Sequence, residues 1–172
     1  MYTSLSQIPP LPKANFSFNI EWRDLRTFII ANKYELNPSY QRGYVWTTYQ
    51  KERYIEHILR NGRSGRDILW NCPNWQETTG DSQWHDTLEL VDGKQRLEAV
   101  SGFLAGTVQA FGKYLPDYSE GGVSRGRLRY DFVFHVNTLA TKREVIDWYL
   151  GINAGGSMHT KDDLHIARQL LG

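Results

Sequence analysis

The chain has 172 residues, of which 40% are hydrophobic and 23% are charged, and its formal net charge is +1. This length suits one domain with a substantial core. A net charge so near zero excludes a global electrostatic attraction to nucleic acids or membrane surfaces, so any contact with nucleic acid needs a local basic patch. Two arginine clusters either supply such a patch or simply face solvent: Arg60, Arg63 and Arg66, and Arg125, Arg127 and Arg129.

Cys72 is the only cysteine, so no internal disulfide can form and no zinc site can be built from cysteines. Such cysteine usage fits a reducing cytosol. The N-terminus has no basic-then-apolar leader, and no apolar run approaches the ~20 residues that span a bilayer. We therefore expect a cytoplasmic protein that has no membrane partner.

The N-terminal part of the chain predicts an arm, a strand and a helix in turn. Residues 1–15 are rich in proline and predict an arm that is poorly ordered unless it docks. Residues 16–20 alternate in polarity, which predicts a short strand. Apolar residues then recur at spacings of three and four across residues 21–32, which predicts a helix with Asn19 as its N-cap.

A polar and aromatic loop at residues 40–46 precedes a second predicted helix. Thr47 and Gln50 have the spacing of a capping box, which predicts where this helix begins. Asn61 and Gly62 form a strong termination signal, because both residues tolerate the left-handed conformation that often follows a helix.

The rest of the chain mixes strand and helix patterns without internal repeats or linkers. The expected strands are residues 67–72, 87–91, 107–111 and 128–136, and the expected helices are residues 94–105, 141–153 and 160–171. We therefore expect an α+β fold in which helices flank a small mixed sheet, within one domain of residues 16–172.

Three stretches at the ends of predicted elements concentrate polar side chains or glycines: residues 37–46, 92–96 and 153–159. Loops at element ends are where function concentrates. If the three stretches converge, their arginine, lysine and glutamine side chains suit a polyanion, because guanidinium groups bind phosphate oxygens bidentately. Tyr40 or Trp46 could stack on a base.

The turn at residues 92–96 allows two interpretations when it is considered alone. A glycine lets the backbone approach a ligand, and the N-terminus of the following helix offers unpaired N–H groups, which together make a natural phosphate site. Alternatively, Asp92 only caps the helix and Arg96 is a solvated residue of its first turn.

Several other chemistries lack their sequence patterns. There is no Gly-x-x-x-x-Gly-Lys-Ser/Thr loop and no Gly-x-Ser-x-Gly elbow. The histidines do not have the spacing of zinc ligands, so no metal-ligating residue is predicted. The five histidines are His57, His85, His135, His159 and His165.

The three polar stretches, in this order, resemble the signatures of a known family. They are Asn-Pro-Ser-Tyr-Gln-Arg-Gly-Tyr-Val-Trp (37–46), Val-Asp-Gly-Lys-Gln-Arg-Leu (91–97) and Ile-Asn-Ala-Gly-Gly-Ser-Met-His (152–159). The family supplies the N-terminal, GmrS-like half of GmrSD-type modification-dependent restriction enzymes and belongs to the ParB/sulfiredoxin superfamily. The resemblance runs from about residue 19 to the C-terminus.

This resemblance implies a compact ParB/sulfiredoxin-like fold with a nucleotide pocket. In related defence proteins, an Asp-Gly-Gln-Gln-Arg-type motif is tied to binding and hydrolysis of nucleoside triphosphates. Carried over to this chain, catalysis falls to Asp92 and Arg96, with Mg²⁺ as the ion that accompanies the nucleotide. The residues expected to bind the nucleotide or its phosphates are Tyr40, Gln41, Arg42, Trp46, Gly93, Lys94, Gln95, Asn153, Gly155, Gly156 and His159.

The chain also departs from the family pattern. Lys94 replaces the commonest glutamine, although lysine is compatible with phosphate. The C-terminal nuclease half is absent, so we do not expect DNA cleavage by that route. The short form, with His159 after the glycine pair, resembles stand-alone members found in phages and prophages.

Three functional hypotheses follow. The first is a nucleotide-binding domain that slowly hydrolyses a nucleoside triphosphate, linked to phage–host conflict or to sensing of DNA modification. In it, Arg42, Lys94 and Arg96 neutralise phosphate charge, and Asp92 orients water or holds a divalent ion. The second is a binding module without catalysis that grips DNA or a partner protein. The third is a ParB-like nuclease.

Overall fold

The structure, a computed structural model, describes residues 4–7, 12–31, 34–41, 43–75, 87–118, 130–153 and 165–170. Its strands are β1 (Phe16–Glu21), β2 (Tyr34–Glu35), β3 (Asp67–Asn71), β4 (Leu88–Asp92) and β5 (Asp131–Asn137). Its α-helices are α1 (Trp22–Ala31), α2 (Thr48–Leu59), α3 (Lys94–Leu104), α4 (Lys142–Asn153) and α5 (His165–Gln169). Short 3₁₀ helices lie at η1 (Leu5–Gln7) and η2 (Leu115–Asp117).

The five strands of the described residues form one mixed sheet in the order β1-β5-β3-β4-β2. The pairs β1–β5 and β3–β4 are antiparallel, whereas β3–β5 and the short β2–β4 pair are parallel. A mixed sheet flanked by helices confirms the predicted α+β class. The relationship to the ParB/sulfiredoxin superfamily stays a prediction.

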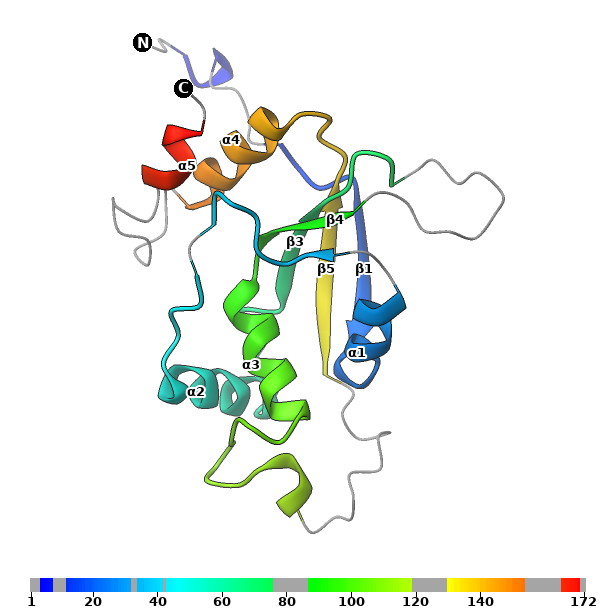
Figure 1. Cartoon of the computed structure of the whole chain (residues 1–172), viewed down its shortest axis with the longest axis vertical. Coiled ribbons are helices and arrows are strands. Elements are labelled where there is room, and N and C mark those ends of the chain that lie inside the picture. The colour runs from blue at the N-terminus through cyan, green and yellow to red at the C-terminus, as the bar shows by residue number, and fades with distance from the viewer. Residues whose placement is uncertain are drawn as a thin grey trace.

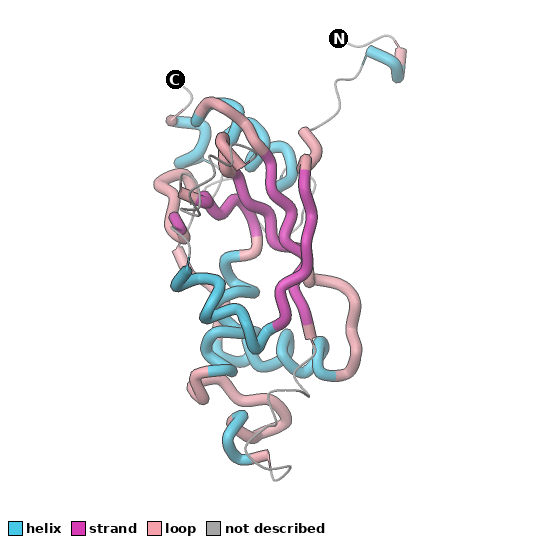
Figure 2. The backbone as a smooth tube through the Cα atoms, turned by 90° about the vertical axis from the view of Figure 1, so that its right-hand side faces the viewer, coloured by secondary structure: helices cyan, strands magenta, loops and turns pink. Residues whose placement is uncertain are grey.

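Alternating side chains of the strands enter two separate cores. Ile68 and Trp70 of β3 pack with Phe134 of β5 and with residues of α1, α2 and α3. Leu69 of β3 and Val91 of β4 pack instead with α4 and α5. Figure 1 shows α4 and α5 at one end of the sheet and α2 and α3 at the other, and Figure 2 shows the strands as one layer between them.

The strongest sequence patterns are confirmed. In β5, Phe132, Phe134 and Val136 are fully buried, as their alternation predicts. The capping box of α2 is present, because Thr47 N donates to Gln50 Oε1 at 2.8 Å and Gln50 N donates to Thr47 Oγ1 at 3.3 Å. An equivalent reciprocal pair, formed by residues 141 and 144, begins α4.

The prediction that Asn19 caps the first helix is wrong. Asn19 lies within β1, where its Nδ2 donates to Asp131 Oδ2 of β5 at 2.6 Å. The strand continues to Glu21, and Trp22 N donates to Tyr130 O at 2.8 Å as the helix begins. The local sequence around Asn19 fits both a helix cap and a strand. Its pairing with β5, which is distant in sequence, determines that it forms a strand.

The predicted strand at residues 107–111 is also wrong. The segment forms only an isolated bridge between Ala110 and Lys113, around a tight turn. Phe111 and Gly112 occupy this turn with φ of 49° and 73°. Alternation alone does not make a strand when no neighbouring strand is available to pair with it.

Some predictions lie outside the described residues. They include most of the N-terminal arm and residues 160–164 at the start of the expected last helix. None of the described helices is both long enough and apolar enough to cross a membrane.

Candidate functional site

The turn from β4 into α3 depends on Gly93. This residue has φ of 105°, a left-handed conformation that side chains rarely adopt. A Cβ atom there would collide with the end of the Ile68 side chain and lie 3.3 Å from Ile68 Cα. Gly93 is therefore needed for the close packing of this turn on β3. It is also the N-cap residue of α3, and it makes no side-chain cap hydrogen bond.

Two glutamines join the first polar stretch to the second. Gln41 Nε2 donates to the backbone oxygens of Leu90 and Val91, at 2.5 and 2.9 Å. Gln95 Oε1 accepts hydrogen bonds from the backbone N–H groups of residues 45 and 46, both at 3.1 Å, and its Nε2 donates to Gly43 O at 3.2 Å. These amide groups, which we predicted to bind phosphates, hold the two stretches together.

Tyr40, which belongs to the first polar stretch, is fully buried. Its ring centre lies 5.1 Å from that of Tyr149, and the Lys142 amine lies 4.6 Å from the centre of the Tyr40 ring. Burial, followed by the nearby Glu89 carboxylate, raises the pKa of Tyr40 far above its ordinary value. Tyr40 is thus a neutral core residue that packs the first stretch against α4.

Arg96 is held in one orientation by two partners. Its Nη2 lies 2.5 Å from Asp92 Oδ2, four residues earlier, and its Nη1 donates to the backbone oxygen of Asp67. Such charge-assisted bonds are stronger than neutral ones. Asp92 and β3 therefore fix the guanidinium group before any ligand arrives.

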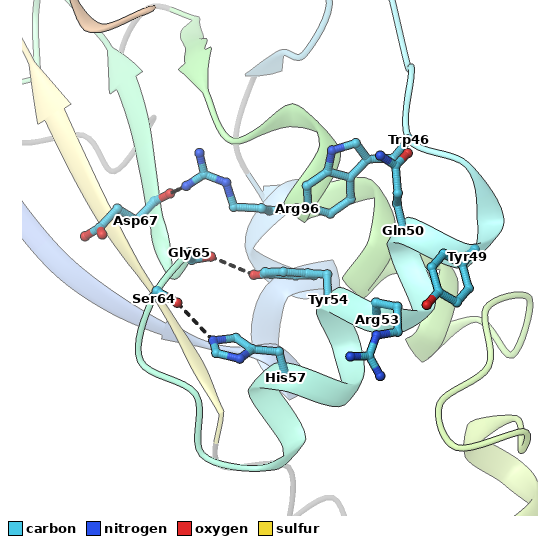
Figure 3. Close-up of a pocket in the computed structure, with 10 residues that line it drawn as sticks. All are labelled: Trp46, Tyr49, Gln50, Arg53, Tyr54, His57, Ser64, Gly65, Asp67 and Arg96. Atoms are coloured by element: carbon cyan, nitrogen blue, oxygen red, sulfur yellow. Dashed lines mark hydrogen bonds between the residues drawn. The ribbon is translucent and has the colours of Figure 1, made fainter. Parts of the chain in front are cut away.

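Arg96 lines a cleft of about 690 Å³ between α2, the start of α3 and the start of β3. Figure 3 shows Arg96 above Tyr54 and His57 below it, with Arg96 reaching toward Asp67 and His57 toward Ser64. The lining residues are Trp46, Tyr49, Gln50, Arg53, Tyr54, His57, Ser64, Gly65, Asp67 and Arg96.

Aromatic side chains form one wall of this cleft. The ring centres of Trp46 and Tyr54 lie 5.3 Å apart, and Tyr49 beside them is 69% exposed. Tyr54 donates from its hydroxyl to Gly65 O at 2.8 Å. Burial raises the pKa of Tyr54, although Arg96 lowers it in part, so the hydroxyl stays protonated and keeps this bond at neutral pH.

Lys94 lies away from the cleft, although it precedes Arg96 by only two residues. Its side chain is buried, and its Nζ lies 4.9 Å from the centre of the Tyr44 ring. Burial lowers the pKa of the amine, although the Glu35 carboxylate acts in the opposite direction. A separation of two residues corresponds to about 200° of rotation around an α-helix, so Lys94 and Arg96 point to different sides of α3.

The third polar stretch is described only at its first residue. Asn153 is buried at the end of α4 and donates from Nδ2 to Tyr149 O at 2.7 Å. Because Tyr149 contacts Tyr40, the stretches beginning at residues 37 and 153 approach each other through these rings. Arg42, Gly155, Gly156 and His159 lie outside the described residues.

Two arginines of the first cluster, Arg60 and Arg66, have partners within the chain. Arg66 is ion-paired with Asp131 at 3.0 Å, and its Nε donates to Gly62 O at 3.0 Å. The Arg60 guanidinium lies 5.0 Å from the centre of the Phe111 ring. The second cluster, residues 125, 127 and 129, lies outside the described residues.

The contribution of α2 to the cleft was not predicted from the sequence. Tyr49, Arg53 and His57 recur every four residues and line the cleft from one helical face, opposite the buried Ile55 and Ile58. That spacing was visible in the sequence and was the available signal. No group of three or more His, Cys, Asp or Glu side chains among the described residues could hold a metal ion.

The geometry thus defines a small α+β domain with a polar cleft beside its central strand-to-helix turn. Residues 25–142 match the family of the GmrSD restriction endonuclease N-terminal domain, and the chain belongs to this family. The match includes the first two polar stretches and ends before the third. No curated protein and no solved structure matches the chain.

Proposed function

We propose that this domain binds a nucleoside triphosphate in the cleft and hydrolyses it slowly. One observation carries the proposal: Trp46 of the first stretch and Arg96 of the second line the same cleft. Its volume of about 690 Å³ lies within the usual range of small-molecule sites, about 300–1,000 Å³.

Arg96 and Arg53 are the proposed phosphate ligands. Both line the cleft, from α3 and α2, and a guanidinium group offers several donors in a fixed plane. Arg96 is already oriented by Asp92 and Asp67, so binding need not restrict it much further. This preorganisation supports phosphate binding because less side-chain entropy is lost.

Trp46 and Tyr49 are the proposed contacts for the base. Both rings line the cleft, and the exposed ring of Tyr49 has a free surface on which a base could stack. Stacking of this kind contributes about 1–3 kcal/mol per base and tolerates any base. The aromatic wall therefore supports nucleotide binding without selecting one nucleotide.

Asp92 and Arg96 are the proposed catalytic pair. Arg96 stabilises charge that develops on the transferred phosphoryl group, and Asp92 keeps Arg96 in place. A magnesium ion would arrive with the triphosphate, because magnesium is commonly held by phosphates and one or two carboxylates. Asp92 would then share its carboxylate between the ion and Arg96.

The family supplies the proposed setting. Its name comes from a restriction endonuclease, which acts on DNA, so we propose that the nucleotide serves sensing of DNA modification or phage–host conflict. DNA and a partner protein are the further partners that this setting implies.

Calorimetry with ATP, GTP and CTP, each with and without magnesium, tests the proposal. We expect saturable binding of at least one nucleotide, and loss of at least about tenfold in affinity for Arg96→Ala, or about 1.4 kcal/mol. Arg23→Ala is the matched control, because Arg23 also pairs with a carboxylate, Glu21, at 2.6 Å but lies in α1.

Unchanged affinity in a folded Arg96→Ala variant would overturn the proposed site. Duplex DNA binding with a steep salt dependence, and no nucleotide binding, would support the non-catalytic binding module instead. Metal-dependent nicking of DNA that Asp92→Ala removes would support the nuclease.

A further inference from the structure

The cleft contains a hydroxyl–imidazole pair that the proposed function does not use. His57 Nε2 lies 3.0 Å from Ser64 Oγ, and both residues line the cleft. Figure 3 shows the imidazole of α2 and the serine of the following loop facing each other below Tyr54. A base within hydrogen-bond reach of a hydroxyl is the arrangement that activates a serine as a nucleophile.

The local backbone is shaped to form this pair. Asn61 has φ of 63°, which turns the chain back after α2, and Gly62 N donates to His57 O at 3.0 Å. A Cβ atom on Gly62 would collide with the His57 ring, so the glycine provides the space that the imidazole occupies. On the other side of Ser64, the Tyr54 hydroxyl fixes Gly65 through its backbone oxygen.

The pair also has the charged surroundings that phosphoryl transfer requires. Arg53 lies one helical turn before His57 on the same face of α2, and Arg96 lines the cleft from α3. Guanidinium groups at such positions stabilise charge on a transferring phosphoryl group. A nucleotide whose phosphates contact these arginines has its terminal phosphorus in the same cleft as Ser64.

We propose that Ser64 accepts the terminal phosphoryl group of the bound nucleoside triphosphate, with His57 as the general base. This step rests on the proposed nucleotide site. Ser64 Oγ forms a bond to the γ-phosphorus, and the bond from that phosphorus to the β–γ bridging oxygen breaks. The proton of Ser64 passes to His57 Nε2, and the nucleoside diphosphate leaves. Attack of water on the resulting phosphoserine restores the serine and releases phosphate.

This sequence of steps accounts for a slow nucleotidase. Formation of phosphoserine and its hydrolysis are separate events, and the arginines that assist the first step also hold the product phosphate. The overall reaction is therefore hydrolysis of the triphosphate, with the covalent intermediate on this chain.

Rapid quench followed by peptide mass spectrometry tests the proposal on the full chain. The protein is mixed with ATP, GTP or CTP carrying a labelled γ-phosphate, in the presence of magnesium. We expect phosphoserine at Ser64, none in Ser64→Ala, and a rate of labelling about 100-fold lower in His57→Gln. Nucleotide affinity of His57→Gln should stay within about twofold of wild type, because His57 acts on the hydroxyl.

Gly62→Ala provides a second variant that leaves both reacting residues in place. Its methyl group should turn the His57 ring away from Ser64, so labelling should fall by at least about tenfold while the protein stays folded. Folding is checked by circular dichroism for every variant.

Two outcomes separate this proposal from the one on which it rests. Nucleotide binding and hydrolysis without label on Ser64 under single-turnover conditions would overturn the phosphoserine step and leave the nucleotide site standing. Label on another residue at equal or greater extent would overturn it as well. Absence of nucleotide binding in the wild type would overturn both proposals.

Discussion

The cleft and one part of the sheet face, over β1, β5 and the start of β3, carry the same two kinds of polar pair. Each region has a serine hydrogen-bonded to a histidine and an arginine bonded to an aspartate. In the cleft they are His57–Ser64 at 3.0 Å and Arg96–Asp92 at 2.5 Å. On the sheet they are Ser17–His135 at 2.8 Å and Arg66–Asp131 at 3.0 Å. The other ring nitrogen of His135, Nε2, lies 2.7 Å from Asp67 Oδ1.

The two regions differ in what surrounds these pairs. Ser17 and His135 are register partners on adjacent strands, so the sheet itself brings them together. In the cleft, His57, Ser64 and Arg96 come from α2, a loop and α3, and they line a concave space with an aromatic wall. Asp92 belongs to β4 and holds Arg96 in place. A reacting group needs a substrate held in position, so the concave lining of the cleft makes it the better candidate for a reaction, although the residue types in the two regions are the same.

Asp67 belongs to both regions and connects them. Its backbone oxygen accepts the hydrogen bond from Arg96, whereas its carboxylate accepts one from His135. Figure 3 shows this carboxylate pointing away from Arg96. Variants near the start of β3 therefore test whether the cleft and the sheet face act independently.

The largest effect should come from Gly93→Ala, because it disturbs both regions. The new methyl group would press on Ile68, the neighbour of Asp67, and the residue would keep an unfavourable positive φ. Backbone strain and overpacking together should lower the free energy of unfolding by about 2–5 kcal/mol.

Urea unfolding measures this loss, and Gly43→Ala is the matched control. No atom lies within 4 Å of a Cβ atom built at Gly43, so that variant should change stability by less than about 0.5 kcal/mol. Equal stabilities for Gly93→Ala and the wild type would show that β3 and the turn are not packed as described.

A smaller effect, which depends on pH, should come from Lys94→Met on the far side of α3. Burial lowers the pKa of Lys94 from its ordinary 10.5, so the unfolded chain binds more protons between the two pKa values. The contribution of Lys94 to stability therefore rises with pH through that window. The methionine variant should be at least as stable as wild type at neutral pH, and its advantage should shrink toward pH 10.5.

Unfolding measured at several alkaline pH values gives this difference directly. Tyr118, whose pKa is raised mainly by burial, acts in the opposite direction in the wild type. Its contribution largely cancels when the two proteins are compared. A stability difference that does not vary with pH would show that folding does not lower the pKa of Lys94.

Local sequence predicted the elements whose signals are local. The capping pair at residues 47 and 50 fixes the start of α2, and alternation through Phe132 and Phe134 fixes β5. The role of Asn19 was not predictable in this way, because its side chain is hydrogen-bonded to Asp131, which is 112 residues away in the sequence. The turn at Phe111 likewise follows from the lack of a partner strand rather than from its own residues.

The candidate site was predictable in outline and not in detail. Sequence identified the stretches that contain Arg96 and Trp46, which do meet in one cleft. It could not distinguish a glutamine that binds a ligand from Gln41 or Gln95, which bind the main chain, because the side chains are chemically the same. Sequence predicted that α2 ends at Asn61 and Gly62, but not that the reversal of the chain there brings Ser64 into the cleft beside His57.

The smallest effect should come from His135→Gln on the sheet face. Cross-strand side-chain pairs contribute about 0.2–1 kcal/mol, so the free energy of unfolding should fall by no more than about 1 kcal/mol. Nucleotide affinity and labelling of Ser64 should not change, because the bond from Arg96 reaches the Asp67 main chain and not its carboxylate. A tenfold loss of either would show that His135 acts on the cleft through Asp67, and the two regions would then form a single site.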